Sequence, residues 1–296
     1  TIVPADDVVL MTDAPRDSLR KRKSSLAVAV DLVKKGKADA VVSPSNTGAF
    51  LAHAQMSWRN LPGIKKPAIA TLLPTFHDKV VIIDSGAVVD CKPHQLVNFA
   101  IMGSTYARVI LDRPSPRLGL MSIGEEETKG NELTITTNQL LRKTGLNFLG
   151  NAEGRDVWTG DFDVVCCDGF VGNVVLKTAE GLSRMITELL KREARKSIPT
   201  MVGGALIYPA VKSIKRRVDY DEAGGAPLLG VNGIAIICHG SSNAKAIMNA
   251  LRVAAESHSR HLVDQLRSDL EHYHEVMQER GVSAKVVSGE EPPDTV

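Results

Sequence analysis

Four short apolar runs, each followed directly by a small polar segment, constrain the fold of this chain more than any other feature. The runs span residues 40–42, 118–123, 164–167 and 234–238, and the segments after them are rich in Gly, Asn, Ser or Thr. A short continuous apolar run is typical of a strand that is buried on both faces of a sheet. Helix-compatible sequence follows each polar segment. The repeated order of strand, polar turn and helix predicts an α/β fold.

The rest of the chain continues this alternation. We predict strands at residues 38–42, 68–73, 80–83, 117–123, 163–167 and 233–238. We predict helices at residues 16–35, 48–59, 94–111, 132–143, 173–196 and 243–280. Such alternation favours a Rossmann-like architecture, in which a mostly parallel sheet carries helices on both faces.

The domain organisation follows from this pattern. We expect a single α/β domain over residues 1–280, from which a helical segment near residues 200–220 protrudes. The residues from 281 to 296 are polar and rich in Pro and Glu, so they are predicted to form a disordered tail.

The polar segments after the four runs are expected to meet in one crevice. In an open parallel sheet, ligands bind beyond the carboxyl ends of the strands. Helix N-termini at that edge offer free N–H groups and a positive dipole end, which suit a phosphate or an oxyanion. The segment after residue 123 also contains three adjacent carboxylates, Glu125 to Glu127. They are typical of a solvated loop, although they could also orient lysines or bind a divalent cation.

The composition excludes several classes of protein. The 296 residues carry a formal net charge of +2 and only 4% are aromatic, which argues against a nucleic-acid binder. No secretory signal opens the chain and no apolar run reaches the length of a bilayer span, so a cytoplasmic protein is expected.

The cysteines point to core packing rather than to chemistry. Cys91, Cys166, Cys167 and Cys238 form no C-x-x-C pair, so neither a zinc site nor a thioredoxin-like motif is expected. A nucleophilic pair of Cys238 with His239 is disfavoured, because neighbours in a strand point to opposite faces.

The segment 203–218 does not fit the core pattern, since it is apolar at its start and basic at its end. A helical face with Leu206 and Ile207 would lie beside four cations, Lys212, Lys215, Arg216 and Arg217. This pattern suits an anionic membrane surface or an acidic protein partner. The alternative is a helix packed on the core or at a dimer interface, with its cations merely solvated.

An ordered series of motifs resembles one enzyme family. The motifs include Gly-Glu-Glu-Glu at 124–127, Lys-Gly-Asn-Glu-Leu at 129–133, Asp-Gly-Phe-Val-Gly-Asn at 168–173, Gly-Gly-Ala-Pro-Leu-Leu-Gly at 224–230 and His-Gly-Ser-Ser at 239–242. Further matches lie at 23–25, 38–43, 46–49, 89–93 and 151–156. The chain resembles the bacterial phosphate acyltransferases of phospholipid synthesis over roughly residues 8–260.

This resemblance implies a reaction and its partners. Inorganic phosphate would attack the thioester of an acyl-acyl carrier protein and give an acyl phosphate. The nucleophile is then the phosphate itself, so the resemblance implies no covalent enzyme intermediate, no cofactor and no metal. The implied fold is similar to that of the isocitrate and isopropylmalate dehydrogenases. The implied partners are the acidic carrier protein, a second copy in a homodimer, a downstream glycerol-phosphate acyltransferase and the inner face of the cell membrane.

The chain departs from the family pattern in a few places. An additional strand with an Asp- and Gly-rich turn usually precedes the segment that opens this chain. Pro44 and Ser45 stand where Ala and Gly are usual, and Val88 stands where an Asn is usual. The change at Val88 removes an amide donor and acceptor near the implied site.

The resemblance and the polar junctions suggest the residues of the site. The candidate catalytic residues, which would bind phosphate, stabilise an oxyanion or assist thiol departure, are Asn46, Lys129, Asn131 and His239. The candidate substrate-binding residues are Thr47, Gly48, Lys92, Glu132, Asn173, Lys177 and Ser241. The Asn, Ser and Thr residues among them are also the types that cap helices.

Three other functions remain open at this level. A phosphotransacylase that uses coenzyme A would share the reaction class but not the acyl donor. An NAD-dependent dehydrogenase of similar fold is also conceivable, since a fold alone does not define a function; no G-x-G-x-x-G fingerprint supports it. The third alternative is a non-enzymatic, membrane-docked scaffold.

Overall fold

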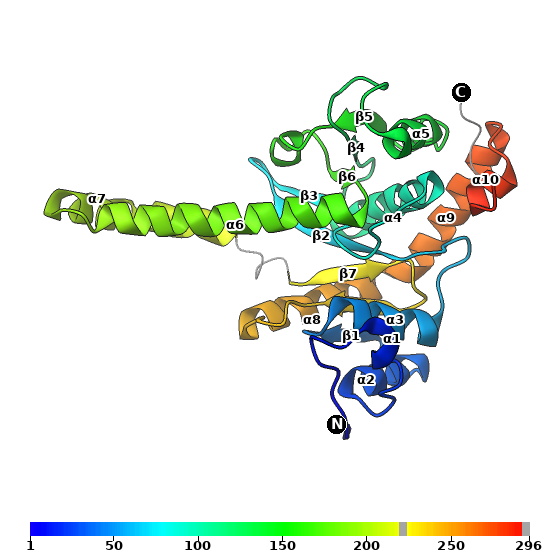
Figure 1. Cartoon of the computed structure of the whole chain (residues 1–296), viewed down its shortest axis with the longest axis horizontal. Coiled ribbons are helices and arrows are strands. Elements are labelled where there is room, and N and C mark those ends of the chain that lie inside the picture. Colours follow the sequence, from blue (N-terminus) through cyan, green and yellow to red (C-terminus); the bar gives the residue numbers. More distant parts are fainter. Residues whose placement is uncertain (219–223, 292–296) are drawn as a thin grey trace.

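The architecture is an eight-stranded mixed sheet with helices on both faces (Figure 1). The computed structural model describes residues 1–218 and 224–291, without the side chains of residues 215–218. The strands are β1 (Ala40–Ser43), β2 (Ala68–Pro74), β3 (Lys79–Ile83), β4 (Leu118–Met121), β5 (Phe148–Ala152), β6 (Val164–Cys166), β7 (Ala226–Leu229) and β8 (Ile234–Ile237). Their order in the sheet is β1-β8-β7-β2-β3-β6-β4-β5.

Helices lie on both faces of the sheet (Figure 1). The first helices along the chain are α1 (Pro15–Ser18), α2 (Ser25–Lys34), α3 (Thr47–Trp58), α4 (Pro93–Ile110), α5 (Glu132–Leu141) and the 3₁₀ helix η1 (Asp156–Trp158). The later ones are α6 (Gly169–Ala194), α7 (Ile198–Val218), α8 (Ala244–Ser259), α9 (Leu262–Glu279) and α10 (Ala284–Ser288). At the β1 and β8 edge, α2 and α3 pack on one face and α8 on the other. The predicted helix coverage is therefore confirmed.

The strand directions divide the sheet into two halves. The strands β1 and β8 are parallel to each other, and β3, β6, β4 and β5 are parallel to one another. Between these groups, β7 and β2 pair antiparallel with each other and with their outer neighbours β8 and β3. The two parallel groups consequently run in opposite directions. The expectation that all four polar junctions share one edge is therefore wrong, because β1 and β8 end at one edge while β4 and β6 end at the other.

All six predicted strands are present, and two further strands were missed. The strands β5 and β7 contain Gly, Asn or Pro, which interrupt the apolar runs that identify the others. Because three of the strand pairings are antiparallel, the sheet is mixed and only its two outer groups are parallel.

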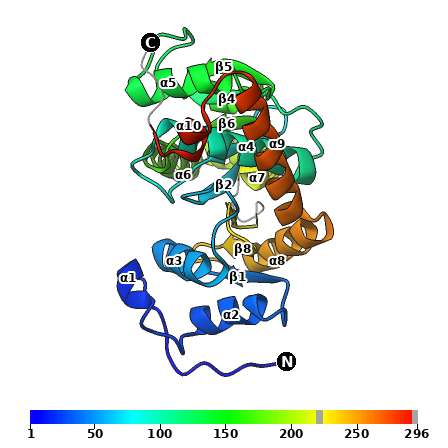
Figure 2. The same ribbon diagram turned by 90° about the vertical axis from the view of Figure 1, so that its right-hand side faces the viewer.

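Three helix predictions need correction. The predicted helix at 16–35 is two helices, since Ser24 accepts a hydrogen bond from the Ala27 amide and so caps α2 after a turn. The predicted final helix is broken between α8 and α9, where His261 takes a left-handed conformation with φ of 52°. The expected disordered tail contains α10, whose Val287 is buried; Figure 2 shows α10 near α9 and α4.

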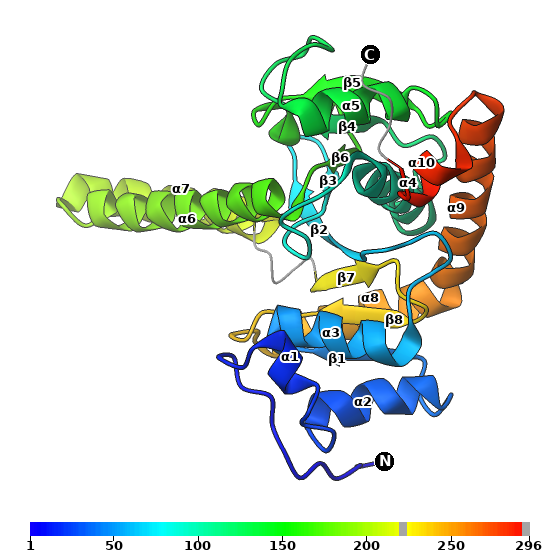
Figure 3. The same cartoon turned by 45° about the vertical axis from the view of Figure 1, so that its right-hand side comes forward.

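The helices α6 and α7 form a hairpin that projects from the body of the molecule (Figures 1 and 3). On α7, Leu206 and Ile207 are exposed by 76% and 56%, as expected for a protruding apolar segment. Lys212 is exposed, whereas the side chains of Lys215, Arg216 and Arg217 lie outside the described part of the chain. Within that part, no helix combines the length and the apolarity needed to cross a membrane.

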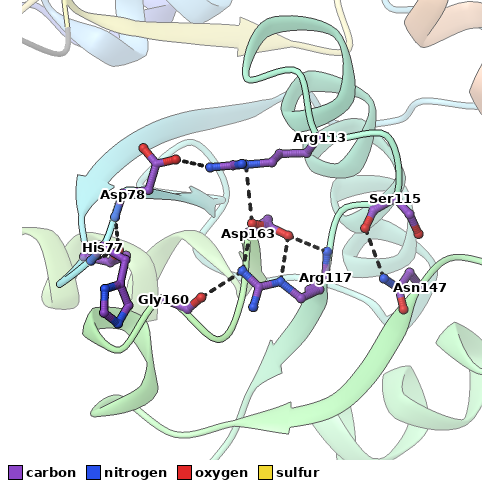
Figure 4. A network of polar contacts seen from close by, with 9 residues as sticks. His77, Asp78, Arg113, Ser115, Arg117, Asn147, Gly160 and Asp163 are labelled. Carbon is purple, nitrogen blue, oxygen red and sulfur yellow. Dashed lines mark hydrogen bonds and ion pairs between the residues drawn. The ribbon is translucent and has the colours of Figure 1, made fainter.

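An ion-pair cluster holds the amino ends of the central strands together (Figure 4). Asp163, just before β6, accepts hydrogen bonds from the Arg117 amide and guanidinium, while Arg113 bridges Asp163 and Asp78. Burial raises the pKa of Asp163, but the bonds from Arg117 outweigh it and hold the pKa below its usual value. Because this cluster lies at the strand starts, it stabilises the fold without approaching the pocket described below.

Candidate functional site

The candidate site is a pocket where the sheet splits between β7 and β2. These two strands pair only through Ala68 with Leu229 and Ile69 with Leu228. Beyond that point, β2 continues paired with β3, whereas β7 pairs with β8. A cavity of about 270 Å³ lies here, lined from β2 on one side, from β7 and β8 on the other, and by α6. The split explains how residues from both halves of the sheet reach one pocket.

The polar lining of the pocket comes from both halves of the sheet. It consists of Thr47, Thr71, Ser85, Asn173, Lys177, Glu180, His239 and Ser242. Thr47 is the first residue of α3, and Ala246, which also lines the pocket, lies in the first turn of α8. Two helix N-termini thus adjoin the pocket, and their positive dipole ends favour an anion there.

Lys177 is the lysine among the described residues that line the pocket. Its ammonium group donates to Glu180 Oε2 at 2.9 Å, one turn further along α6. Both side chains are partly exposed, at 51% and 27%, so this pair is weak and can open when an anion enters. The pocket therefore combines two helix N-termini with a lysine held by a partly exposed ion pair.

His239 is fixed in orientation by its own loop. The Ser241 amide donates to His239 Nδ1 at 3.2 Å, and Ser241 Oγ lies 2.6 Å from the same nitrogen. Because Nδ1 accepts from a backbone N–H, the proton of the neutral ring lies on Nε2. His239 follows β8 and lines the pocket, and in this tautomer the hydrogen-bond donor of its ring is Nε2–H.

A buried carboxylate supports one wall of the pocket. Asp84 is fully buried at the end of β3, and it accepts hydrogen bonds from the amides of Ile69, Gly86, Ala87 and Val88. Burial raises the pKa of Asp84, although these four amides oppose the rise by favouring the ionised form. The side chain therefore shapes the Ser85–Gly86 turn, which lines the pocket, and ties it to β2.

The start of α6 lies directly against Asp84. A Cβ at Gly169 would come within 2.6 Å of Asp84 Oδ2, and one at Gly172 would overlap the Asp84 carbonyl oxygen. Asp168 caps the helix by accepting from the Val171 amide at 2.9 Å. The Asp-Gly-Phe-Val-Gly-Asn motif thus allows α6 to begin so close to β3 that Asn173 and Lys177 face the pocket.

The structure brings together five of the residues that the sequence suggested. Thr47, Asn173, Lys177 and His239 line the pocket, and Ser241 holds the His239 ring. They come from three of the four polar junctions. Their convergence depends on α6, which starts after β6, packs against β3 and then projects from the body of the molecule (Figure 3).

Three other suggested residues near these loops have structural partners. Asn46 caps α3 by accepting from the Ala49 amide, and its amide group donates to the carbonyls of Met11 and Asp13. Gly48 packs so closely on Pro15 that a Cβ would lie 2.8 Å from its Cγ. Lys92 is exposed before α4, where its amide donates to Gln95 Oε1. None of the three is among the described residues that line the pocket.

The acidic junction after β4 lies apart from the pocket, and neither Lys129, Asn131 nor Glu132 is among its described lining residues. Asn131 caps α5 by accepting from the Thr134 amide, and Lys129 and Glu132 are exposed. Glu125 and Glu127 pair with Arg155 and Arg142 respectively. Across residues 1–218 and 224–291, no group of three or more His, Cys, Asp or Glu side chains could hold a metal ion.

Sequence reasoning missed several lining residues. Ser85 and Gly86 follow β3, and the run Ile82-Ile83-Asp84-Ser85-Gly86 has the same strand-to-polar form as the four junctions that were recognised. Thr71 gave no comparable signal, since it lies within an apolar strand and its Oγ1 meets Ser85 Oγ at 2.7 Å only in the folded chain.

The cysteines and Val88 behave as core residues. Cys166, Cys167 and Cys238 are buried, and burial raises the pKa of each thiol, so none is poised as a thiolate. The Val88 side chain is also buried in the main core, and its amide rather than its side chain serves Asp84. Val88 is not among the described residues that line the pocket.

Comparison with known proteins identifies the family. The family described as fatty acid synthesis protein matches residues 1–265. A phosphate acyltransferase of Desulforamulus reducens is 53% identical over 272 residues, which are 92% of this chain and 81% of that protein. One of Pelotomaculum thermopropionicum is 50% identical, over 91% of this chain and 79% of its own length. The chain belongs to the phosphate acyltransferase family.

Solved structures agree with this family at the level of the fold. The EutD phosphotransacetylase from Staphylococcus aureus aligns with a TM-score of 0.57 and 14% identity, over 83% of this chain and 71% of its own. A phosphotransacetylase from Streptococcus pyogenes aligns with a TM-score of 0.52 and 17% identity, over 86% and 69%. This phosphate acyltransferase therefore shares an α/β fold with phosphotransacetylases. These alignments do not confirm the expected similarity to the dehydrogenase fold.

Proposed function

We propose that this phosphate acyltransferase transfers a long-chain acyl group from an acyl-acyl carrier protein to inorganic phosphate in the pocket between β7 and β2. The observation that carries the proposal is the meeting of two helix N-termini, Lys177 and His239 around one cavity that also has an apolar side. The polar groups suit a phosphate, and the apolar side suits an acyl chain.

The chemistry assigned to the pocket needs no nucleophile from the protein. A phosphate oxygen attacks the thioester carbonyl carbon, a C–O bond forms and the C–S bond breaks. The departing thiolate takes the proton that hydrogen phosphate carried, so the products are an acyl phosphate and a free thiol. The N-termini of α3 and α8 and Lys177 would hold the phosphate in line with the carbonyl. His239 Nε2–H would donate to the carbonyl oxygen as it becomes negative.

The first test is thiol release from palmitoyl-acyl carrier protein, with and without inorganic phosphate, with hydroxylamine trapping of the product. We expect release only in the presence of phosphate, together with a trappable acyl phosphate. Release that does not depend on phosphate would contradict the proposal. The same assay with palmitoyl-coenzyme A distinguishes the alternative acyl donor, which would be favoured if it were turned over faster.

We further propose that the enzyme works as a homodimer at the inner face of the cell membrane, where a glycerol-phosphate acyltransferase would consume its product. The exposure of Leu206 and Ile207 on the projecting α7 supports contact with anionic lipid, alongside the neighbouring exposed Lys212. We expect the wild type to float with anionic vesicles in a sucrose gradient and a Leu206→Gln, Ile207→Gln variant to remain in the load. Equal flotation of both would show that this segment does not bind lipid.

A further inference from the structure

We propose that the apolar side of the pocket binds the first carbons of the acyl chain, and that Leu73, Leu176 and Ala226 determine which chain lengths react best. This inference rests on the proposed function and extends it by assigning an acyl subsite. The preference for a chain length would then depend on the apolar side chains that line the pocket.

Most of the apolar residues of the pocket lining come from four elements, β2, α6, β7 and β8. On β2, Ile69 and Leu73 lie on one face of the strand, with the polar Thr71 between them on the same face. Leu176 of α6 packs on the same cluster as Leu73, while Ala226 begins β7 beside Ile237 at the end of β8. All of these residues line the cavity that also contains His239 and Thr47. A thioester held at His239 would thus have apolar side chains within the same cavity for its acyl chain.

The apolar side chains of the pocket differ in how deeply they are buried. Leu73 is only 6% exposed, whereas Leu176 and Ala226 are half-buried. Substitutions at the two half-buried positions therefore change the shape of the pocket with little loss of core packing. Ala226 has one of the smallest side chains in the wall, so a larger residue there would fill the pocket.

The size of the cavity limits how much of the chain it holds. Its volume of about 270 Å³ falls near the lower end of ligand sites, which span roughly 300–1,000 Å³. Phosphate and the thioester group occupy part of this space, so only a short acyl segment fits beside them. Reactivity should therefore rise by about fourfold for each buried methylene, and then level off once the chain reaches the mouth of the pocket.

The test is the chain-length profile of kcat/KM at saturating phosphate, measured with acyl-pantetheine thioesters from acetyl to dodecanoyl. For the wild type we expect a steep rise followed by a plateau. The Ala226→Leu variant should reach its plateau at a shorter acyl chain. The Leu176→Ala variant should have a kcat/KM that is severalfold lower for medium chains and unchanged for the acetyl thioester. The matched control is Leu182→Ala, on the same helix but 51% exposed and outside the described pocket lining, and it should leave the profile unchanged.

The outcomes separate this inference from the proposed function. Phosphate-dependent turnover with the same chain-length profile in wild type, Ala226→Leu and Leu176→Ala would overturn the acyl subsite alone. Phosphate-independent thiol release at every chain length would overturn the proposed function itself. Should Ala226→Leu fail to fold, as judged by thermal unfolding, the Leu176→Ala profile decides the question, since the removal of half-buried atoms leaves the core intact.

Discussion

Replacement of His239 by alanine is expected to lower kcat for phosphate-dependent acyl transfer by about 10²–10³-fold, the usual cost of removing one oxyanion donor. The Ser241 amide bond to Nδ1 places the proton of the neutral ring on Nε2, and the ring lines the pocket beside the N-terminus of α3. Because a donor that acts mainly in the transition state is lost, KM for the acyl donor should change much less than kcat.

Two further variants test this role for His239. Glutamine can place a side-chain N–H close to the position of Nε2, so His239→Gln should recover part of the activity that His239→Ala loses. The control is His272→Ala, because His272 is an exposed histidine on α9, away from the pocket lining. If His239→Ala retained wild-type kcat, or if glutamine restored nothing, the assignment of Nε2–H as an oxyanion donor would be wrong.

Replacement of Gly172 by alanine is expected to lower the free energy of unfolding by about 3 kcal/mol. An added Cβ would overlap the carbonyl oxygen of Asp84, which is backbone and cannot rotate away. The start of α6 would have to move, and Asn173 and Lys177 would move with it, so phosphate-dependent turnover should fall as well. Urea denaturation followed by circular dichroism measures the first effect, and thiol release measures the second.

A second glycine on the same helix provides a control, because its replacement by alanine should change the free energy of unfolding in the opposite direction. Gly181 lies further along α6, and a Cβ there would meet nothing within 4 Å. Since alanine is a better helix former than glycine, Gly181→Ala should raise the free energy of unfolding by about 1 kcal/mol. A gain of stability of similar size in both variants would mean that helix propensity, rather than the close approach of α6 to Asp84, sets the effect at Gly172.

Local pattern was sufficient for much of the fold. The six predicted strands are mostly apolar runs with many buried side chains, and such runs can be read from the chain without knowledge of their neighbours. Strand β7, with Pro227 in its middle, lacks that signal and pairs only briefly with β2. The family resemblance, carried by ordered motifs rather than by any single one, was confirmed by the relatives at about half identity.

The candidate site was less predictable, because polar residues after strands serve two purposes. Asn46 and Asn131 cap helices, whereas Thr47 and His239, in the same kind of junction, line the pocket. The residue type is the same for a cap and for a ligand-binding group. Only the partner that each side chain meets in the folded chain separates the two roles.

The sequence by itself determined that this is an α/β acyltransferase with strands ending in polar turns, since apolar periodicity and motif order are properties of the chain alone. The tertiary structure decided which turns meet. Two antiparallel strands, β7 and β2, reverse the direction of half the sheet and send the junction after β4 to the opposite edge from that after β8. The long α6 then returns Asn173 and Lys177 to His239. Strand direction depends on hydrogen bonds between segments far apart in the chain, and no local pattern encodes it.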